Sequence, residues 1–130
     1  LIIVLLIRIT MEKNKNTKIY YIYRDGSNYK THNEVIFLGQ INSGFIKDIL
    51  EKELYEFVPS QIGLIDLQGD LQLFDSEVSE DDHCWHEFTG IETTDEEPND
   101  KAGRTIHQFI KQAIDTNFVE IEIGHILNNK

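Results

Sequence analysis

The sequence has little cysteine, little proline and no long apolar run, and each shortage excludes a class of protein. A single cysteine among 130 residues rules out an internal disulfide, which fits a protein of the reducing cytoplasm. The longest uninterrupted apolar run, Leu1 to Ile7, is far shorter than the roughly 20 residues that cross a bilayer. Two prolines and an apolar share of 40% indicate a folded domain with a core rather than a disordered chain.

Basic residues are missing altogether from residues 75 to 100, which we call the acidic stretch, although eleven of the 23 acidic residues lie there. The rest of the chain carries twelve acidic and twelve basic residues, so the net charge of −11 comes from this stretch alone. Such a charge is repelled by the phosphates of nucleic acids and by anionic lipid surfaces. We therefore expect basic proteins or cations as partners, and neither nucleic acid nor membrane.

The pattern of apolar and turn residues predicts an α+β fold, in which a mainly antiparallel sheet of about five strands packs against two amphipathic helices. Residues 18–24 are dense in Tyr and Ile on both faces, which is typical of a central strand. The turn residues Asp25 and Gly26 follow, and the apolar run 35–38 predicts an antiparallel partner strand. Further strands are predicted at residues 62–67, around Leu71 and Leu73, at 84–91 and at 118–123.

Two segments carry apolar residues at helical spacing. The first begins at Asn42 or Ser43 as a cap, and its apolar face consists of Phe45, Ile46, Ile49, Leu50 and Leu54. The second begins at Thr105, which is placed to form a capping box with Gln108, and ends at Asn117. Its predicted buried stripe consists of Ile106, Phe109, Ile110, Ala113 and Ile114.

These elements predict one domain over residues 18–125, followed by a polar tail at residues 126–130. Residues 1–17 form a leader whose start is apolar. This leader is interpreted either as an edge strand or as an over-extended reading frame with its natural start at Met11.

The acidic stretch also contains the residue types of a metal site. His83, Cys84 and His86 have suitable spacing for zinc, but side chains alternate along a strand, so Cys84 and His86 share one face while His83 and Glu87 share the other. Two ligands do not complete a site, and His107 or His125 would have to supply another. The stretch also fails as an EF-hand loop, since an acidic residue occupies the position of the required glycine.

A nucleophilic role for Cys84 requires His86 as its base, and the carboxylates nearby oppose formation of the thiolate. We therefore predict no catalytic residue, no bound metal and no cofactor. The candidates for the alternative hypothesis, a metal-binding protein or a metal-dependent hydrolase, are His83, Cys84, His86 and His107, with Glu87 beside them.

The leading hypothesis is a non-enzymatic cytoplasmic binding protein that engages a basic surface of a nuclease or toxin. Concentrated negative charge speeds encounter with a positive cleft by about tenfold to a thousandfold, and Trp85 and His86 would supply anchors within the interface. An immunity protein or a nucleic-acid mimic that blocks a defence nuclease fits this description; an accessory domain kept soluble by its acidic loops is a further alternative. The predicted partner-binding residues are Asp75, Glu77, Glu80, Asp81, Asp82, Trp85, Glu87, Glu92, Asp95, Glu96 and Glu97.

Three segments, residues 23–30 (YRDGSNYK), 81–88 (DDHCWHEF) and 94–98 (TDEEP), resemble those of a group of small acidic bacterial proteins that are uncharacterised. The resemblance covers about residues 18–115. It implies an independent single domain of bacterial origin in which these motifs belong together. It implies no activity, cofactor or catalytic residue.

Overall fold

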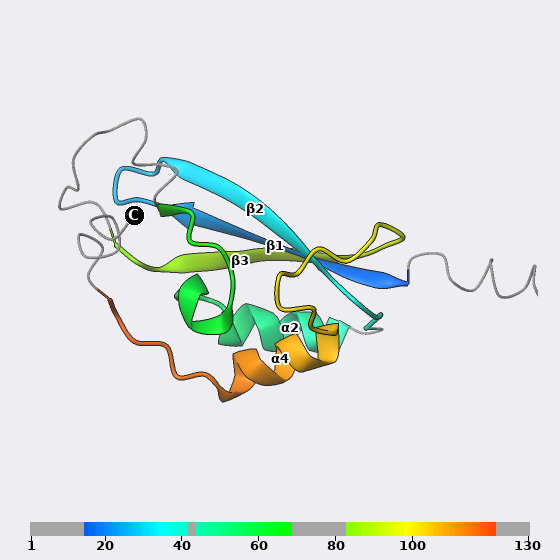
Figure 1. Cartoon of the computed structure of the whole chain (residues 1–130). Coiled ribbons are helices and arrows are strands. Elements are labelled where there is room, and N and C mark those ends of the chain that lie inside the picture. The colour runs from blue at the N-terminus through cyan, green and yellow to red at the C-terminus, as the bar shows by residue number, and fades with distance from the viewer. Residues whose placement is uncertain (1–14, 42–43, 69–82, 122–130) are drawn as a thin grey trace, which may run out of the picture.

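The chain folds into two layers, a sheet and a pair of helices that cover one of its faces (Figure 1). The structure is a computed structural model, and the residues that it describes are 15–41, 44–68 and 83–121. The prediction of a single α+β domain with two helices is confirmed. The sequence predicts about five strands, whereas the described residues form a sheet of three.

The sheet is antiparallel, and its strands lie in the order β2-β1-β3. The strand β1 (Asn16–Arg24) is central, as its two apolar faces predict, with β2 (Lys30–Phe37) on one side and β3 (His86–Thr94) on the other. The tight turn between β1 and β2 is stabilised by Asp25, whose Oδ1 accepts hydrogen bonds from the backbone N–H groups of Ser27 and Tyr29, both at 2.9 Å.

Both outer strands extend beyond the apolar residues that predicted them. β2 begins at Lys30 rather than at Val35, because backbone pairing with β1 continues through polar residues whose side chains are largely exposed. β3 begins at His86 and continues to Thr94, so Glu92 lies in the strand and not in the predicted loop. Glu92 pairs with the lysine at position 18 of β1, which compensates its charge within the sheet.

The helices α2 (Gly44–Glu53) and α4 (Ile106–Asp115) pack on the sheet around an aromatic core (Figure 1). Phe37 of β2 stacks on Phe109 of α4 with ring centroids 4.3 Å apart. The predicted buried stripes are too wide, since Phe45 is 70% exposed and Ile114 is 47% exposed. A helix that lies on a narrow sheet buries only the residues that face the sheet directly, and these two residues lie outside that stripe.

The predicted capping box is confirmed at the start of α4. The Thr105 side chain accepts a hydrogen bond from the backbone N–H of Gln108 at 3.1 Å, and the Gln108 side chain accepts one from the backbone N–H of Thr105 at 2.9 Å.

Residues 62–67 do not form the predicted strand. A 3-10 helix (Pro59–Ile62) ends at Gly63, which has a φ of 70°, and the chain to Leu67 is irregular. The carbonyl oxygens of Ile62 and Gly63 are instead bound by the guanidinium of Arg104, at 2.6 and 3.3 Å. A side chain therefore takes the place of a neighbouring strand.

The predicted strand at residues 118–123 is also absent from its described part. The backbone N–H and C=O of Val119 are both bonded to the side-chain amide of Gln61, at 3.1 and 2.8 Å, and residues 117–121 have no regular structure. Several predicted features lie outside the described residues: the leader to position 14, the cap at Asn42 or Ser43, the strand around Leu71 and Leu73, and the tail. In the part of the chain that the structure describes, no helix is long and apolar enough to cross a membrane.

Arg104 contacts three segments of the fold: the chain after the 3-10 helix, the strand β2 and the helix α4. Its guanidinium donates to both carboxylate oxygens of Asp100 at 2.8 and 2.9 Å and to the side chain of Gln112 at 2.8 Å, and it lies over the rings of Phe37 and Phe109. Burial raises the pKa of Asp100, but the hydrogen bonds from Arg104 outweigh it and hold this pKa below its ordinary value. The ion pair is buried, with 11% of the Arg104 side chain and 2% of the Asp100 side chain exposed.

Substitution of Arg104 by Ala is expected to lower the free energy of unfolding by about 3–5 kcal/mol, because the carboxylate of Asp100 is left buried without its partner. The matched control is Arg24→Ala, which removes an exposed arginine paired with Glu87 and is expected to cost less than about 1 kcal/mol. Urea unfolding of both variants measures the difference. Equal losses would show that Arg104 does not hold these segments together.

Candidate functional site

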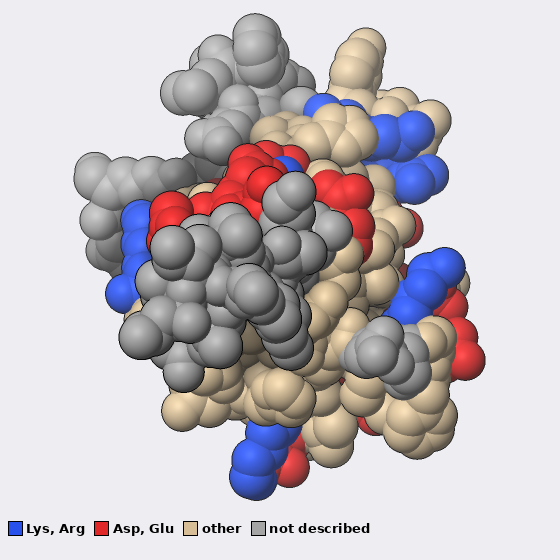
Figure 2. Space-filling view, turned by 90° about the vertical axis from the view of Figure 1, so that its right-hand side faces the viewer, with Lys and Arg blue, Asp and Glu red and all other residues tan. Residues whose placement is uncertain are grey.

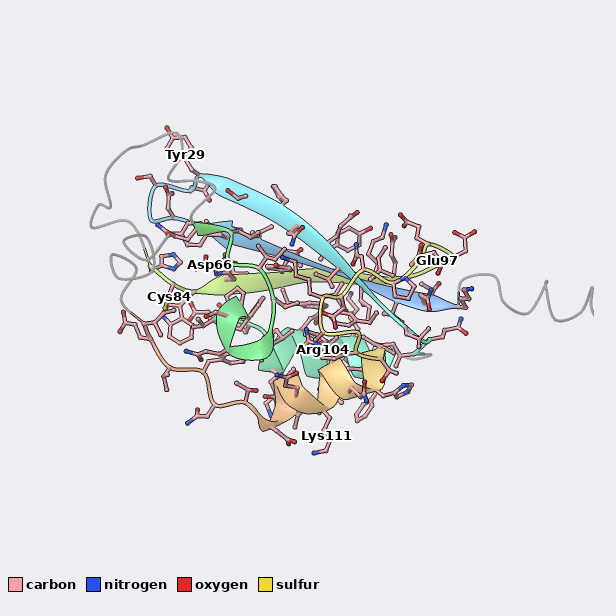
Figure 3. The ribbon with its side chains drawn as sticks, in the orientation of Figure 1. Tyr29, Asp66, Cys84, Glu97, Arg104 and Lys111 are labelled. Atoms are coloured by element: carbon pink, nitrogen blue, oxygen red, sulfur yellow. The ribbon has the colours of Figure 1, made fainter. Side chains whose placement is uncertain are left out.

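The structure separates the predicted partner-binding residues into two groups at opposite ends of β3. Trp85 and Glu87 lie at its beginning, and Asp95 to Glu97 follow its end. The strand has nine residues, which at about 3.3 Å each place its ends roughly 25 Å apart. Figure 3 shows Cys84 and Glu97 at opposite ends of the sheet. The other predicted acidic residues, Asp75, Glu77, Glu80, Asp81 and Asp82, lie outside the described residues.

The carboxylates at the end of β3 are gathered around a buried lysine. Lys18 of β1 is 7% exposed, and its Nζ lies 3.8 Å from Glu34 of β2 and 3.9 Å from Glu92 of β3. The same ammonium contacts Glu96, which follows β3. We call these four residues the Lys18 cluster.

The geometry of the Lys18 cluster follows from the sheet. Lys18 sits opposite Glu92 in the pairing of β1 with β3, and Glu34 lies diagonally across on β2, so the three side chains share one face. The hydroxyl of Tyr20 donates a hydrogen bond to Glu92. The hydrogen bond between Lys18 and Glu96 raises the pKa of the lysine, against the effect of burial, and lowers the pKa of Glu96. Both groups are therefore charged at neutral pH.

A network of hydrogen bonds fixes the turn that carries Glu96. The hydroxyl of Thr94 donates to the Glu96 carboxylate at 3.0 Å and accepts from the Glu96 backbone N–H at 3.1 Å. The side-chain amide of Asn16 donates to the backbone carbonyl of Glu96 at 2.9 Å. These contacts hold the carboxylate over the ammonium of Lys18.

The Lys18 cluster leaves negative charge uncompensated at the surface. It sets three carboxylates against one ammonium, and the side chains of Glu34, Glu92 and Glu96 are 50–53% exposed. Asp95 and Glu97 are exposed beside it and contact no lysine or arginine among the described residues. Figure 2 looks onto the end of the molecule that lies at the right in Figure 1, and acidic side chains gather there. We call these residues together, the Lys18 cluster with Asp95 and Glu97, the acidic end.

At the other end of β3 the charge of Glu87 is compensated, since its carboxylate lies 3.2 Å from the Nε of Arg24. Trp85 is half-buried, and its backbone N–H donates to the Nδ1 of His83 at 3.0 Å. Among the described residues, this end therefore presents a half-buried aromatic side chain beside a carboxylate, that of Glu87, which is paired with an arginine.

His86 is fully buried and is not available as an interface anchor. Its Nδ1 lies 3.1 Å from the carbonyl oxygen of Cys84, and its Nε2 accepts a hydrogen bond from the backbone N–H of Leu67 at 3.0 Å. The ring therefore carries its proton on Nδ1 and is neutral. Burial lowers the pKa of His86 to about 4, although the carboxylate of Asp66, 3.4 Å from Nε2, opposes this shift. The residue has a structural role between β3 and the segment before it.

Cys84 is a buried thiol and not an activated nucleophile. It is 2% exposed, burial raises its pKa, and its sulfur accepts a hydrogen bond from the backbone N–H of Ile121 at 3.5 Å. Figure 3 shows it close to Asp66 at the same end of the sheet.

The described candidate metal ligands are not brought together, and His125 lies outside the described residues. His107 is exposed in the first turn of α4, which begins beside Leu38, where β2 ends opposite Thr17. His86 pairs with Tyr23 at the opposite end of β1. Within residues 15–41, 44–68 and 83–121, no three His, Cys, Asp or Glu side chains are arranged to hold a metal ion.

Some residues of these sites were not predicted from the sequence. Lys18 and Glu34 belong to the Lys18 cluster, but Lys18 is only the charged first residue of the predicted strand 18–24, and Glu34 directly precedes the apolar run 35–38. The side-chain amide of Gln68 is fully buried and makes no hydrogen bond in the part of the chain that the structure describes.

The free energy of unfolding is expected to fall as the pH is lowered from about 6.5 to about 4. The unfolded chain protonates His86 in this interval while the folded chain does not, so the fold loses about 2–3 kcal/mol by pH 4.5. Urea unfolding at pH 7 and at pH 4.5 measures this loss. His86→Gln should be less stable at pH 7 and should lack this part of the pH dependence, whereas His107→Gln, at an exposed position, should keep it. An unchanged slope in His86→Gln would contradict the assignment.

Comparison with known proteins gives no family for this chain. No family model, no curated protein and no solved structure matches it. A function has to be inferred from the residues and geometry described above.

Proposed function

We propose that this chain is a non-enzymatic binding protein that engages a basic surface of another protein through its acidic end. The observation that carries the proposal is the excess of carboxylates in the Lys18 cluster, to which Asp95 and Glu97 add two further exposed charges. An inhibitor of a nuclease or toxin, either an immunity protein or a mimic of nucleic-acid phosphates, is the class of protein that this surface fits.

The carboxylates of the Lys18 cluster are held in place before any partner arrives. Two of them project from paired strands, and the third is fixed by Thr94 and Asn16. A partner that binds such carboxylates pays less side-chain entropy than one that orders a loose acidic loop. This arrangement supports recognition and not only solubility.

The charge of the acidic end also supports rapid association. Among the described residues, the five carboxylates of the acidic end have one lysine, Lys18, within ion-pair distance. The resulting negative potential extends beyond the contact surface and steers a positively charged cleft toward it. The partner must therefore carry clustered lysines or arginines.

The two other hypotheses receive less support. The described positions of His83, His86, Glu87 and His107 offer no common site for a hydrolytic metal. An accessory domain whose acidic residues only maintain solubility would be equally sensitive to charge removal anywhere on its surface, which gives a direct test.

Affinity for a basic probe is expected to weaken steeply with salt. An oligolysine peptide should bind the chain several-fold or more weakly at ~500 mM than at ~50 mM salt, because the Debye length shrinks about threefold over that range. At the lower salt concentration, the double variant Asp95→Asn/Glu97→Gln should bind the peptide more weakly than the unmodified chain does. Fluorescence anisotropy with a labelled peptide measures both effects.

The matched control is Asp48→Asn/Glu56→Gln, which removes the same two charges from exposed positions in and after α2. It should change affinity much less, because these positions are not part of the acidic end. Equal losses in the two double variants would favour the accessory domain, and binding that does not depend on salt would remove the proposal.

A further inference from the structure

The outer edge of β2 has backbone groups that are positioned to pair with another strand. The N–H of Ile36 donates to the side chain of Asn99 at 2.8 Å, and its carbonyl accepts from the backbone N–H of Asn99 at 3.0 Å. Both groups of Ile36 therefore point away from β1. Every second residue of a strand presents its backbone groups to the same side, so those of His32 and Glu34 also point outward. In the described part of the chain nothing pairs with them.

Asn99 already pairs with Ile36, so a strand added to this edge could extend along β2 only as far as the residue before Ile36. Its backbone N–H and its side-chain oxygen reproduce the two hydrogen bonds that a neighbouring strand makes to one residue. The next outward backbone groups along β2 are those of Glu34 and His32, and the side chains of both residues are exposed.

A hollow of about 170 Å³ lies beside this edge. Its walls are Asn33 to Val35 of β2, Gly63 to Ile65 of the segment after the 3-10 helix, and Asn99 to Lys101. Asn33 and Val35 point to the helix side of the sheet, whereas Glu34 points to the open face. A strand added to the edge of β2 would place every second side chain on the helix side, in the hollow.

The charges at this edge favour a basic strand with alternating apolar residues. Glu34 belongs to the Lys18 cluster and lies on the open face, where the intervening side chains of an added strand would project. Glu97 lies two residues before Asn99, at the end of the edge. The walls of the hollow include the apolar side chains of Val35 and Leu64 together with Lys101, so the hollow fits an uncharged side chain and not a basic one.

We propose that the basic partner contributes an extended segment that adds a fourth strand to the sheet at the outer edge of β2. Its backbone pairs with His32 and Glu34, its lysine or arginine side chains lie on the open face beside Glu34, and an uncharged side chain fills the hollow. This inference rests on the proposed function and adds the conformation and the sequence pattern of the segment that is recognised.

Two peptides of alternating lysine and valine test the added strand. They have the same charge, but one carries N-methyl groups on the backbone nitrogens of alternate residues, which blocks pairing along one edge. The unmodified peptide should bind the unmodified chain about tenfold or more tightly than the methylated one, as expected for two lost hydrogen bonds. Fluorescence anisotropy at ~50 mM salt measures both affinities.

A protein variant provides the reciprocal test. His32→Pro removes one outward N–H without a change in acidic charge, and proline is tolerated on the free side of an edge strand. This variant should lose most of the preference for the unmodified peptide, whereas His32→Ala should retain it. Circular dichroism tests whether both variants are folded. If His32→Pro does not fold, the comparison of the two peptides on the unmodified chain remains the test of the added strand.

The outcomes separate this inference from the proposed function. Equal affinity for the two peptides, with a steep salt dependence, would overturn the added strand and leave the acidic end as a charged surface. Equal affinity without salt dependence would overturn both.

Discussion

The ammonium of Lys18 allows three carboxylates, those of the Lys18 cluster, to lie close together on the surface of the sheet. Without a cation among them, Glu34, Glu92 and Glu96 would repel one another at this end of the sheet, and like charges on neighbouring strands are destabilising. With one lysine buried beneath them, the three carboxylates are compatible with the fold and still carry a net negative charge to the surface. The same interaction therefore stabilises the sheet and builds the candidate binding surface.

The features that could be predicted from the sequence are those encoded by neighbouring residues. The central position of β1 follows from its two apolar faces, the hairpin from Asp25 and Gly26, and the start of α4 from Thr105 and Gln108. The uneven distribution of charge was also visible. What it did not reveal is that a nine-residue strand divides the described acidic residues between two ends.

The features that could not be predicted depend on polar side chains that reach across the fold. The apolar residues from Ile62 onward are typical of a strand, but Arg104 binds the carbonyls of Ile62 and Gly63 from 41 or 42 positions away. Gln61 does the same for Val119, 58 positions away. Local patterns contain no information about such partners, so periodicity predicted strands at residues 62–67 and 118–121 that the described residues do not form. The burial of His86 depends on a similar contact, since its ring accepts a hydrogen bond from the backbone N–H of Leu67, 19 positions away.

The pairing of Asn99 with Ile36 has a consequence for self-association. A free strand edge is a template for a second copy of the same chain as well as for a foreign one. Two copies joined antiparallel about Glu34 would set their carboxylates face to face, and Asn99 already fills the neighbouring rung. Pairing of two copies in this register is therefore disfavoured, whereas in the described part of the chain the same position fits a strand of opposite charge.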